Sequence, residues 1–362
     1  MKNGLGQEKN INYDFVDVMK FLMVIFVIIL HAGPISNLLE QNGVVIEGFM
    51  PIDAILRVPV PFFFIVAGFF LYRKMGETIL DFKRIKKYLG RIFKLYCVWY
   101  IIYIPWIIGI ARHSEQGFIL GFLYQILLFF TSGYFHLWFL NALMVAVALV
   151  SYLLYKKISI YKIIGIAGIF YAAVLLNAPY YGVFEVIFPP GGIGFSIVQF
   201  LAKIFVTSRN GLMEGFFFVA IGAGLAFKWR YLSIKWVMLG IISSAILLFV
   251  EIYFVDFVAQ CSFGGADCYI FLVPLSVFIV ILAIEIELPA SLYWIWMRKM
   301  SMLMYYSHVL WLNSLRYLNT YCNWGLGSLH VLLLTIFGTL LLSAFIIKYR
   351  EKPVFSWLKI LG

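Results

Sequence analysis

The first apolar segment of the chain carries three ionisable side chains, Asp17, Lys20 and His31. Inserting a charge at the centre of a bilayer costs roughly 2.5–3.5 kcal/mol, so such residues are candidates for function. Asp17 and Lys20 are three residues apart and can pair, and His31 lies about three helical turns beyond Lys20 on the same face. Imidazole titrates near neutral pH, so we predict that His31 is a catalytic general base, with Lys20 and Asp17 as its catalytic partners. Snorkelling of Asp17 and Lys20 to the interface is the alternative.

The second apolar segment holds an arginine followed by two prolines. Asp53 and Arg57 are four residues apart, and Pro59 and Pro61 follow directly. Prolines remove backbone donors, and such breaks are tolerated at membrane depth where they line a cavity. We therefore predict that Arg57 holds a carboxylate or an acyl carbonyl. A structural Asp53–Arg57 pair that seals a helix end is the alternative.

Further polar residues occur in later apolar segments, mostly toward the end that we assign to the outside. We predict that His31, His136 and His308, together with Arg57 and Arg209, face one cavity that opens to the outside. For His308 alone, a hydrogen-bonded core histidine is the commoner explanation. The candidate substrate-binding residues are Arg57, Asp53, His136, Trp138, Arg209, Asn210, Glu214, Tyr305 and His308.

Composition places the whole chain in a membrane. Of its 362 residues, 64% are hydrophobic and only 12% are charged, which a soluble domain of this length cannot accommodate. A hydrocarbon core of about 30 Å needs about 20 mostly apolar helical residues. We therefore predict an all-α, polytopic membrane bundle that forms one domain over residues 1–362. The expected spans are Phe15–Gly33, Ile52–Tyr72, Leu95–Ala111, Leu137–Tyr155, Lys162–Asn177, Leu212–Phe227, Trp236–Phe254, Tyr269–Ile286, Met302–Leu318 and Val331–Tyr349.

The positive charges of the chain predict its orientation. The formal net charge is +11, with 28 Lys and Arg residues, and such residues concentrate in cytoplasmic loops. Ten spans with both termini inside place about 22 of the 28 on the cytoplasmic side. The apolar stretch Gly117–Thr131 is short, so a re-entrant or interfacial helix is as consistent with it as a crossing. A crossing there would put Lys156, Lys157 and Lys162 outside, which favours ten spans.

A basic block over residues 73–94 alternates Lys and Arg with apolar residues at helical spacing. This pattern predicts an amphipathic helix on the inner leaflet, attracted by anionic lipid. The basic residues can simply mark a cytoplasmic loop, as the positive-inside rule predicts. Alternatively, they can bind a phosphate-bearing donor such as a coenzyme A thioester.

The cysteines and the N-terminus predict little chemistry. Cys97, Cys261, Cys268 and Cys322 lack metal-ligand spacing, and we expect no metal site. Cys261 and Cys268 share one loop, so they can form a disulfide if that loop is external. The first apolar run follows a polar segment without a cleavage site, so we expect it to remain as the first helix.

The motifs resemble those of membrane acyltransferase family 3. That family has an Asp, then Arg or Lys, then a His eleven residues later in its first helix, and Asp17, Lys20 and His31 fit this pattern with Lys where Arg is commoner. The resemblance implies O-acyl transfer from an acyl-CoA, such as acetyl-CoA, with no cofactor bound in the chain. The other matching elements are Arg57–Phe70 around Pro59 and Pro61, His136–Phe139, Arg209–Gly211 and Tyr305–His308.

Within that family, the sequence is most similar to the membrane domain of VanT-type serine racemases of vancomycin resistance. In those proteins a cytosolic, pyridoxal-phosphate-dependent racemase domain follows the last helix. No pyridoxal-phosphate lysine can be placed in these residues, so we do not expect racemisation from them.

Two functions from different classes follow. An acyltransferase would use His31 to deprotonate a small hydroxyl or amine acceptor and Arg57 to stabilise the oxyanion. A serine-binding or serine-importing domain would hold the serine carboxylate with Arg57 or Arg209, and its ammonium with Glu214 or Asp53. The expected partners are the bilayer of a bacterial plasma membrane, the small acceptor or serine, and a fused racemase domain, with no nucleic acid.

Overall fold

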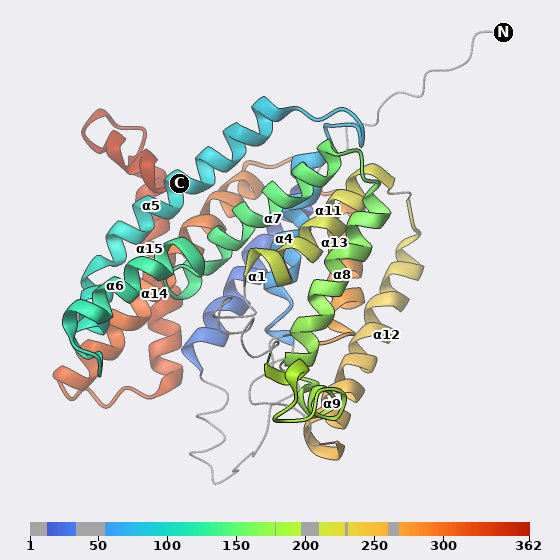
Figure 1. The fold of residues 1–362 in the computed structure, drawn as a ribbon. Helices are drawn as coiled ribbons and strands as arrows, with labels where there is room; N and C mark the ends of the chain where they lie inside the picture. Colours follow the sequence, from blue (N-terminus) through green and yellow to red (C-terminus); the bar gives the residue numbers. More distant parts are fainter. Residues whose placement is uncertain (1–12, 34–54, 178, 197–209, 229–230, 260–267) are drawn as a thin grey trace.

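The computed structural model describes residues 13–33, 55–177, 179–196, 210–228, 231–259 and 268–362, and all regular secondary structure in these residues is helical. This confirms the predicted all-α class of membrane protein. Each of the ten expected spans has a helix in its place (Figure 1). These helices are α1 (Asp14–Ala32), α4 (Pro59–Tyr72), α5 (Phe82–Arg112), α7 (Trp138–Tyr155), α8 (Ile160–Asn177), α11 (Phe216–Lys228), α12 (Ile234–Ile252), α13 (Leu272–Glu285), α14 (Leu292–Tyr321) and α15 (Ser328–Tyr349).

Shorter elements connect or extend these helices. A 14-residue helix, α6 (Phe118–Thr131), occupies the stretch that sequence left open between re-entry and crossing. At 1.5 Å per residue it is about 21 Å long, less than the apolar thickness of a bilayer. The remaining elements are the 3₁₀ turn η1 (Phe135–Leu137), the helix α9 (Tyr181–Ile187), the π-helical segments η2 (Gly211–Gly215) and η3 (Tyr253–Val258), and the 3₁₀ segment η4 (Pro353–Leu361).

Length and composition support a multi-pass membrane protein. Six helical stretches of the described chain, or up to seven, are long and apolar enough to cross a bilayer. Helices α4 and α13 are apolar but have only 14 residues each. The count of ten crossings and the inward orientation of both termini therefore stay predictions.

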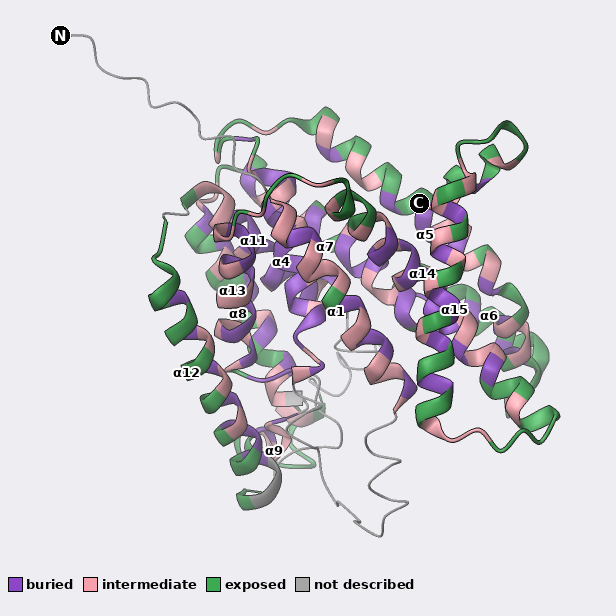
Figure 2. Cartoon of the chain, turned by 180° about the vertical axis from the view of Figure 1, so that it is seen from behind, coloured by how far each residue is buried: buried purple, intermediate pink, exposed green. Residues whose placement is uncertain are grey.

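The centre of the bundle is formed by α1, α4, α7, α11 and α13. Figure 1 shows α8 and α12 on one side of this group and α5, α6, α14 and α15 on the other. Buried residues concentrate on the central helices, whereas α12 and the outer faces of α5 and α6 are largely exposed (Figure 2). The exposed residues on these faces are mostly large and apolar, as expected of lipid-facing surfaces.

Helices α4 and α11 pack with their backbones in contact. A Cβ atom added at Gly68 would lie 2.5 Å from the carbonyl oxygen of Val219, and one added at Gly222 would overlap the carbonyl of Ile65. Without a hydrophobic driving force between helices in lipid, such close approach supplies the packing energy. The two glycines thus hold α4, which presents the candidate site, against α11.

The prolines of the second span lie at the start of a helix and not within it. The regular helix α4 begins at Pro59, so Pro59 and Pro61 fall in its first turn, where a missing N–H costs nothing. Residue 55 is helical and residues 56–58 form turns, so the helical ladder is interrupted directly before Pro59, in agreement with a break at the prolines. Asp53 lies outside the described residues, and so does any pairing between it and Arg57.

The basic segment is not a separate helix. Residues 73–81 form turns, and α5 runs from Phe82 to Arg112 through the predicted third span without a break. The carboxylate of Asp81 accepts a hydrogen bond of 2.9 Å from the backbone N–H of Arg84 and caps this helix. The predicted bounds of the amphipathic helix were therefore wrong, because capping at Asp81 and continuity with the span fix its ends.

Candidate functional site

Four predicted polar residues line one small cavity of about 50 Å³ between the central helices. His31 comes from the last turn of α1, and Arg57 from the turn before α4. The 3₁₀ turn η1 supplies His136, and the π-helical segment η2 supplies Glu214. Both His136 and Glu214 are buried. Aromatic side chains complete the wall: Phe63, Trp138, Phe139 and Tyr305.

Three imidazole rings meet beside this cavity. The ring of His308 stacks on that of His31 with centroids 5.3 Å apart, and its edge-to-face contact with His136 is 4.8 Å. His308 itself does not line the cavity and is fully buried behind His31. The structure thus brings together two histidines from opposite ends of the chain and one from its middle.

Two of the three rings present an unpaired nitrogen. His308 Nδ1 lies 2.7 Å from the carbonyl oxygen of Tyr305, and His136 Nε2 lies 3.3 Å from that of Tyr306. A carbonyl oxygen can only accept, so these nitrogens carry the hydrogen. The other nitrogens, His136 Nδ1 and His308 Nε2, have no hydrogen-bond partner among the described residues. Each is free to accept a hydrogen bond from a hydroxyl or amine.

A tight turn places the side chain of His136 in the wall of the cavity. Gly133 has a φ of 75°, and Phe135 has a φ of 40°, which is rare for a bulky residue. The Phe135 ring packs 4.9 Å from that of His31, and the Tyr305 hydroxyl donates a hydrogen bond of 2.6 Å to the His136 carbonyl oxygen. Contacts on both sides therefore hold this strained turn in place.

The side chain of Asn210 binds backbone N–H groups at the start of η2. Its side-chain oxygen accepts hydrogen bonds from the backbone N–H groups of Leu212 (3.0 Å) and Met213 (2.9 Å), which caps η2. Asn210 does not line the cavity. It acts on the site by fixing the start of the segment that carries Glu214.

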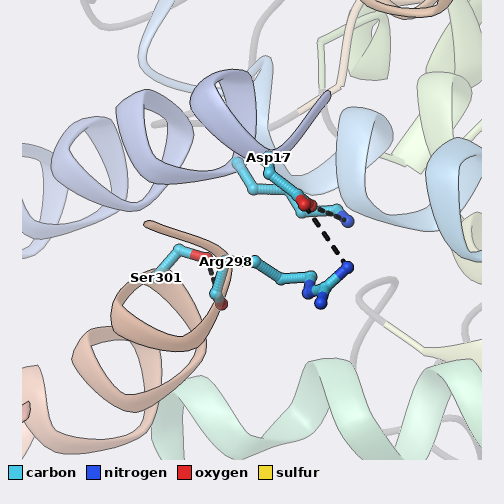
Figure 3. Close-up of polar contacts among 4 residues, drawn as sticks. Asp17, Arg298 and Ser301 are labelled. Atoms are coloured by element: carbon cyan, nitrogen blue, oxygen red, sulfur yellow. Dashed lines mark hydrogen bonds and ion pairs between the residues drawn. The ribbon is translucent and has the colours of Figure 1, made fainter. Parts of the chain in front are cut away.

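A second group of charges lies at the other end of α1. Lys20 pairs with Asp17 at 3.0 Å, which confirms the predicted i, i+3 interaction, and Arg298 of α14 reaches the other oxygen of Asp17 at 3.5 Å. Figure 3 shows Arg298 extending toward Asp17, with Ser301 donating to the Arg298 carbonyl oxygen at 2.9 Å. Sequence reasoning missed Arg298, whose only signal is a basic residue before the ninth span.

Two larger cavities adjoin these charges. One of about 580 Å³ is lined by Asp17, Lys20, Arg84 and Arg298, and another of about 280 Å³ by Lys20, Arg91 and Arg298. Together they place four cations at what we call the basic end of the bundle. Arg84 and Arg91 come from the basic segment of α5, so that segment contributes to the walls of these cavities.

The cavities meet at aromatic side chains. Phe63 of α4 and Phe139 of α7 line the histidine cavity and both cavities of the basic end. Tyr305 of α14 lines the histidine cavity and the smaller basic cavity. These three rings therefore lie between the histidine cavity and the cavities of the basic end.

A model of membrane acyltransferase family 3, described as an acyltransferase domain, matches residues 13–348. The chain belongs to this family. The match covers all the residues that line the cavities at both ends.

Two curated relatives are amino-acid racemases of Enterococcus faecalis. One is 26% identical over 175 residues, which is 48% of this chain and 23% of the racemase. The other is 28% identical over 144 residues, 38% of this chain and 19% of the racemase. The chain thus spans about a fifth of the length of these relatives. No solved structure matches it.

For this member of the acyltransferase family, some predicted residues cannot be placed. Asp53 and Arg209 lie outside the described residues, as does Cys261, so the predicted disulfide with Cys268 stays a prediction. Within the described part of the chain, no three or more His, Cys, Asp and Glu side chains are arranged to hold a metal ion.

Proposed function

We propose that this chain transfers an acyl group from a phosphate-bearing thioester, acetyl-CoA or another acyl-CoA, to a small hydroxyl or amine acceptor. The observation that carries the proposal is that the cavity of His31 and the two cavities of the basic end share Phe63 and Phe139. A thioester bound at one end thereby has a route by which its acyl carbon approaches a histidine at the other. Membership in an acyltransferase family supports the same chemistry.

The basic end suits the donor. Lys20, Arg84, Arg91 and Arg298 line cavities of about 580 and 280 Å³, and guanidinium groups bind phosphate through paired hydrogen bonds. Asp17 lies between Lys20 and Arg298 and keeps their charged groups close together. We place this end in the cytoplasm of a bacterium, in accordance with the positive-inside rule and the bacterial relatives.

The histidine end suits the acceptor. His31 accepts the proton of the acceptor hydroxyl while that oxygen attacks the thioester carbonyl and forms the new C–O bond. Arg57 stabilises the negative oxygen of the tetrahedral intermediate. The C–S bond then breaks, and the thiolate leaves with the proton from the imidazolium of His31. His136 lines the same cavity, and its Nδ1 is a further acceptor by which a bound hydroxyl is oriented.

A transfer assay in membrane vesicles tests this function. Vesicles that contain the chain receive radiolabelled acetyl-CoA, with cell-envelope extract and free serine as acceptors. We expect label in an acceptor, and a loss of at least about 100-fold in rate for His31→Ala, since a general base contributes 10²–10⁴-fold. His330→Ala, at an exposed histidine of α15 away from the cavities, is the control. Full activity of His31→Ala would refute the catalytic assignment.

Serine binding is the second candidate function, and one observation favours it. Arg57 and Glu214 line the same small cavity, so its wall carries one cation and one carboxylate, which match the two charges of an amino acid. The similarity to amino-acid racemases agrees with this chemistry. Under this function the chain would supply serine to a fused racemase domain.

Serine uptake by proteoliposomes separates the two candidates. The serine function predicts saturable binding or uptake of radiolabelled serine that Arg57→Ala abolishes and His31→Ala leaves intact. The acyl-transfer function predicts transfer that His31→Ala abolishes. Unchanged serine affinity in Arg57→Ala would remove the proposed carboxylate anchor.

A further inference from the structure

Three aromatic rings from three helices close the path between the cavities. The centroids of Phe63, Phe139 and Tyr305 lie 6.1 Å (Phe63–Phe139), 6.3 Å (Phe63–Tyr305) and 5.9 Å (Phe139–Tyr305) apart. Aromatic rings at 4.5–7 Å are in contact, so each ring touches the other two. We call this group the aromatic neck. No acyl group passes it unless a ring turns.

Two of the three rings are held from behind. The Tyr305 hydroxyl donates a hydrogen bond of 2.6 Å to the carbonyl oxygen of His136. The Phe139 ring packs against that of Phe64 with centroids 4.4 Å apart, and Phe64 is fully buried. Phe63 packs at the edge of Phe62 with centroids 5.6 Å apart and makes no hydrogen bond. Phe63 is therefore the ring with the most freedom to turn.

The space beyond the neck is much smaller than the space before it. The cavities on the basic side measure about 580 and 280 Å³, whereas the histidine cavity measures about 50 Å³. A single water molecule needs about 10–15 Å³ of cavity volume, so the histidine cavity accommodates roughly four groups of that size. An acetyl group fits beside an acceptor hydroxyl, and each added methylene meets a ring.

We infer that the aromatic neck selects the acyl group by size and restricts transfer to acetyl-sized groups, with Phe63 as the specificity-determining residue. This inference rests on the proposed acyl transfer. Phe63 acts on the acyl chain of the donor and leaves proton transfer at His31 unchanged. Phe63→Ala joins the small cavity to the larger ones and removes the size limit.

The test compares donors of different length in the vesicle assay. Wild-type chain is assayed with acetyl-, butyryl- and hexanoyl-CoA at equal concentration, and so are Phe63→Ala and Phe170→Ala. Phe170 is a half-buried phenylalanine of α8 that lines none of the three cavities, so its variant is the control for ring loss. A methylene in an apolar pocket changes selectivity about 10–200-fold. We expect wild type to prefer acetyl by at least about tenfold, and Phe63→Ala to lose most of that preference.

Each outcome decides one claim. Equal rates with acetyl and hexanoyl donors in wild type overturn the size filter, and so does an unchanged preference in Phe63→Ala that still transfers acetyl. Absence of transfer from any donor by wild type refutes the proposed function instead. If Phe63→Ala does not accumulate in the membrane, Phe63→Leu, which removes the ring and keeps an apolar side chain, takes its place with the same expected direction.

Discussion

The imidazole rings of His31 and His308 stack with their centroids 5.3 Å apart and their planes inclined by 18°. His308 is fully buried, and its Nε2 has no hydrogen-bond partner among the described residues. An unpaired buried polar atom costs about 1–3 kcal/mol. The Nδ1 hydrogen bond to the Tyr305 carbonyl oxygen favours a histidine at this position, whereas the unpaired Nε2 costs stability and is the part of the ring for which we predict a function.

His308→Phe removes the ring nitrogens and keeps an aromatic ring at this position. We expect this variant to stay folded, because the ring contact with His31 remains and the loss of an unpaired nitrogen offsets the loss of the hydrogen bond from Nδ1 to the Tyr305 carbonyl oxygen. We expect its rate of acyl transfer to fall by at least about tenfold, because the ring stacked on the proposed general base His31 loses its polar nitrogens. His330→Phe on α15 is the matched control, and melting temperature and rate are measured on the same preparations. An unchanged rate in His308→Phe would assign His308 to packing alone.

The helices were predictable because their signals are local. Apolar runs and their lengths determine where each of α7, α8 and α15 lies, and the predicted bounds agree to within about three residues. The pairing of Asp17 with Lys20 was predictable for the same reason, since residues three apart face each other on any helix. The start of α4 was not predictable, because proline occurs both in the first turn of a helix and at a kink inside one.

The candidate site was only partly predictable. The convergence of His31, Arg57 and His136 on one cavity follows from their similar depth in separate apolar segments. Arg298 and Arg316 were missed because their partners lie in α1, 285 residues away in the case of Arg316 and His31. Such a distance leaves no periodic signal in a single sequence, and only the packing of α14 against α1 reveals the contact.

Arg316 is predicted to position His31 through the backbone. Its guanidinium donates hydrogen bonds to the carbonyl oxygens of His31 (3.2 Å) and Ala32 (3.1 Å), which are among the last of α1. We expect Arg316→Met to lower kcat about three- to tenfold and to leave the KM for the donor unchanged. Arg316→Lys retains a cation at the helix end and should recover much of the loss.

The split between kcat and KM decides the role of Arg316. If Arg316→Met raises the KM for acetyl-CoA and leaves kcat unchanged, Arg316 acts on the donor and not on His31. If Arg316→Lys is as impaired as Arg316→Met, the charge at the end of α1 does not account for the effect.

Arg298 is predicted to bind the phosphates of the donor. It lines both cavities of the basic end, and more than half of its side chain is exposed at 53%. Asp17 is buried and keeps its pair with Lys20 at 3.0 Å when Arg298 is removed, so we expect Arg298→Ala to fold and to raise the KM for acetyl-CoA about tenfold. The neighbouring basic residue Lys299 lines neither cavity, and Lys299→Ala is the control.

Salt provides an independent measure for Arg298. Charge attraction between solvent-exposed groups weakens as ionic strength rises, so the KM of wild type should rise with salt more steeply than that of Arg298→Ala. Equal salt dependence in the two proteins would contradict a phosphate contact at Arg298.

Glu77 is predicted to make the stability of the bundle pH-dependent. Its carboxylate accepts from Lys228 of α11 at 2.7 Å and from the backbone N–H of Ile160, the first residue of α8, at 2.8 Å. The Lys228 contact, followed by that of Ile160, lowers the pKa of Glu77 below its ordinary value. The carboxylate therefore stabilises the fold fully above the unfolded pKa near about 4.3, and this contribution is lost as the pH falls through the lower folded pKa.

Glu77→Gln tests this dependence by thermal unfolding in detergent. We expect the variant to melt at a lower temperature than wild type at pH 7, because the amide keeps the shape of the side chain and removes the charge that attracts Lys228. The difference should shrink toward zero as the pH falls below about 4, where the wild-type carboxylate takes up a proton. Glu115→Gln, at an exposed carboxylate in the turn between α5 and α6, is the control. A difference that stays constant from pH 7 to about 3 would show that the charge of Glu77 contributes nothing, and that its side chain acts by packing.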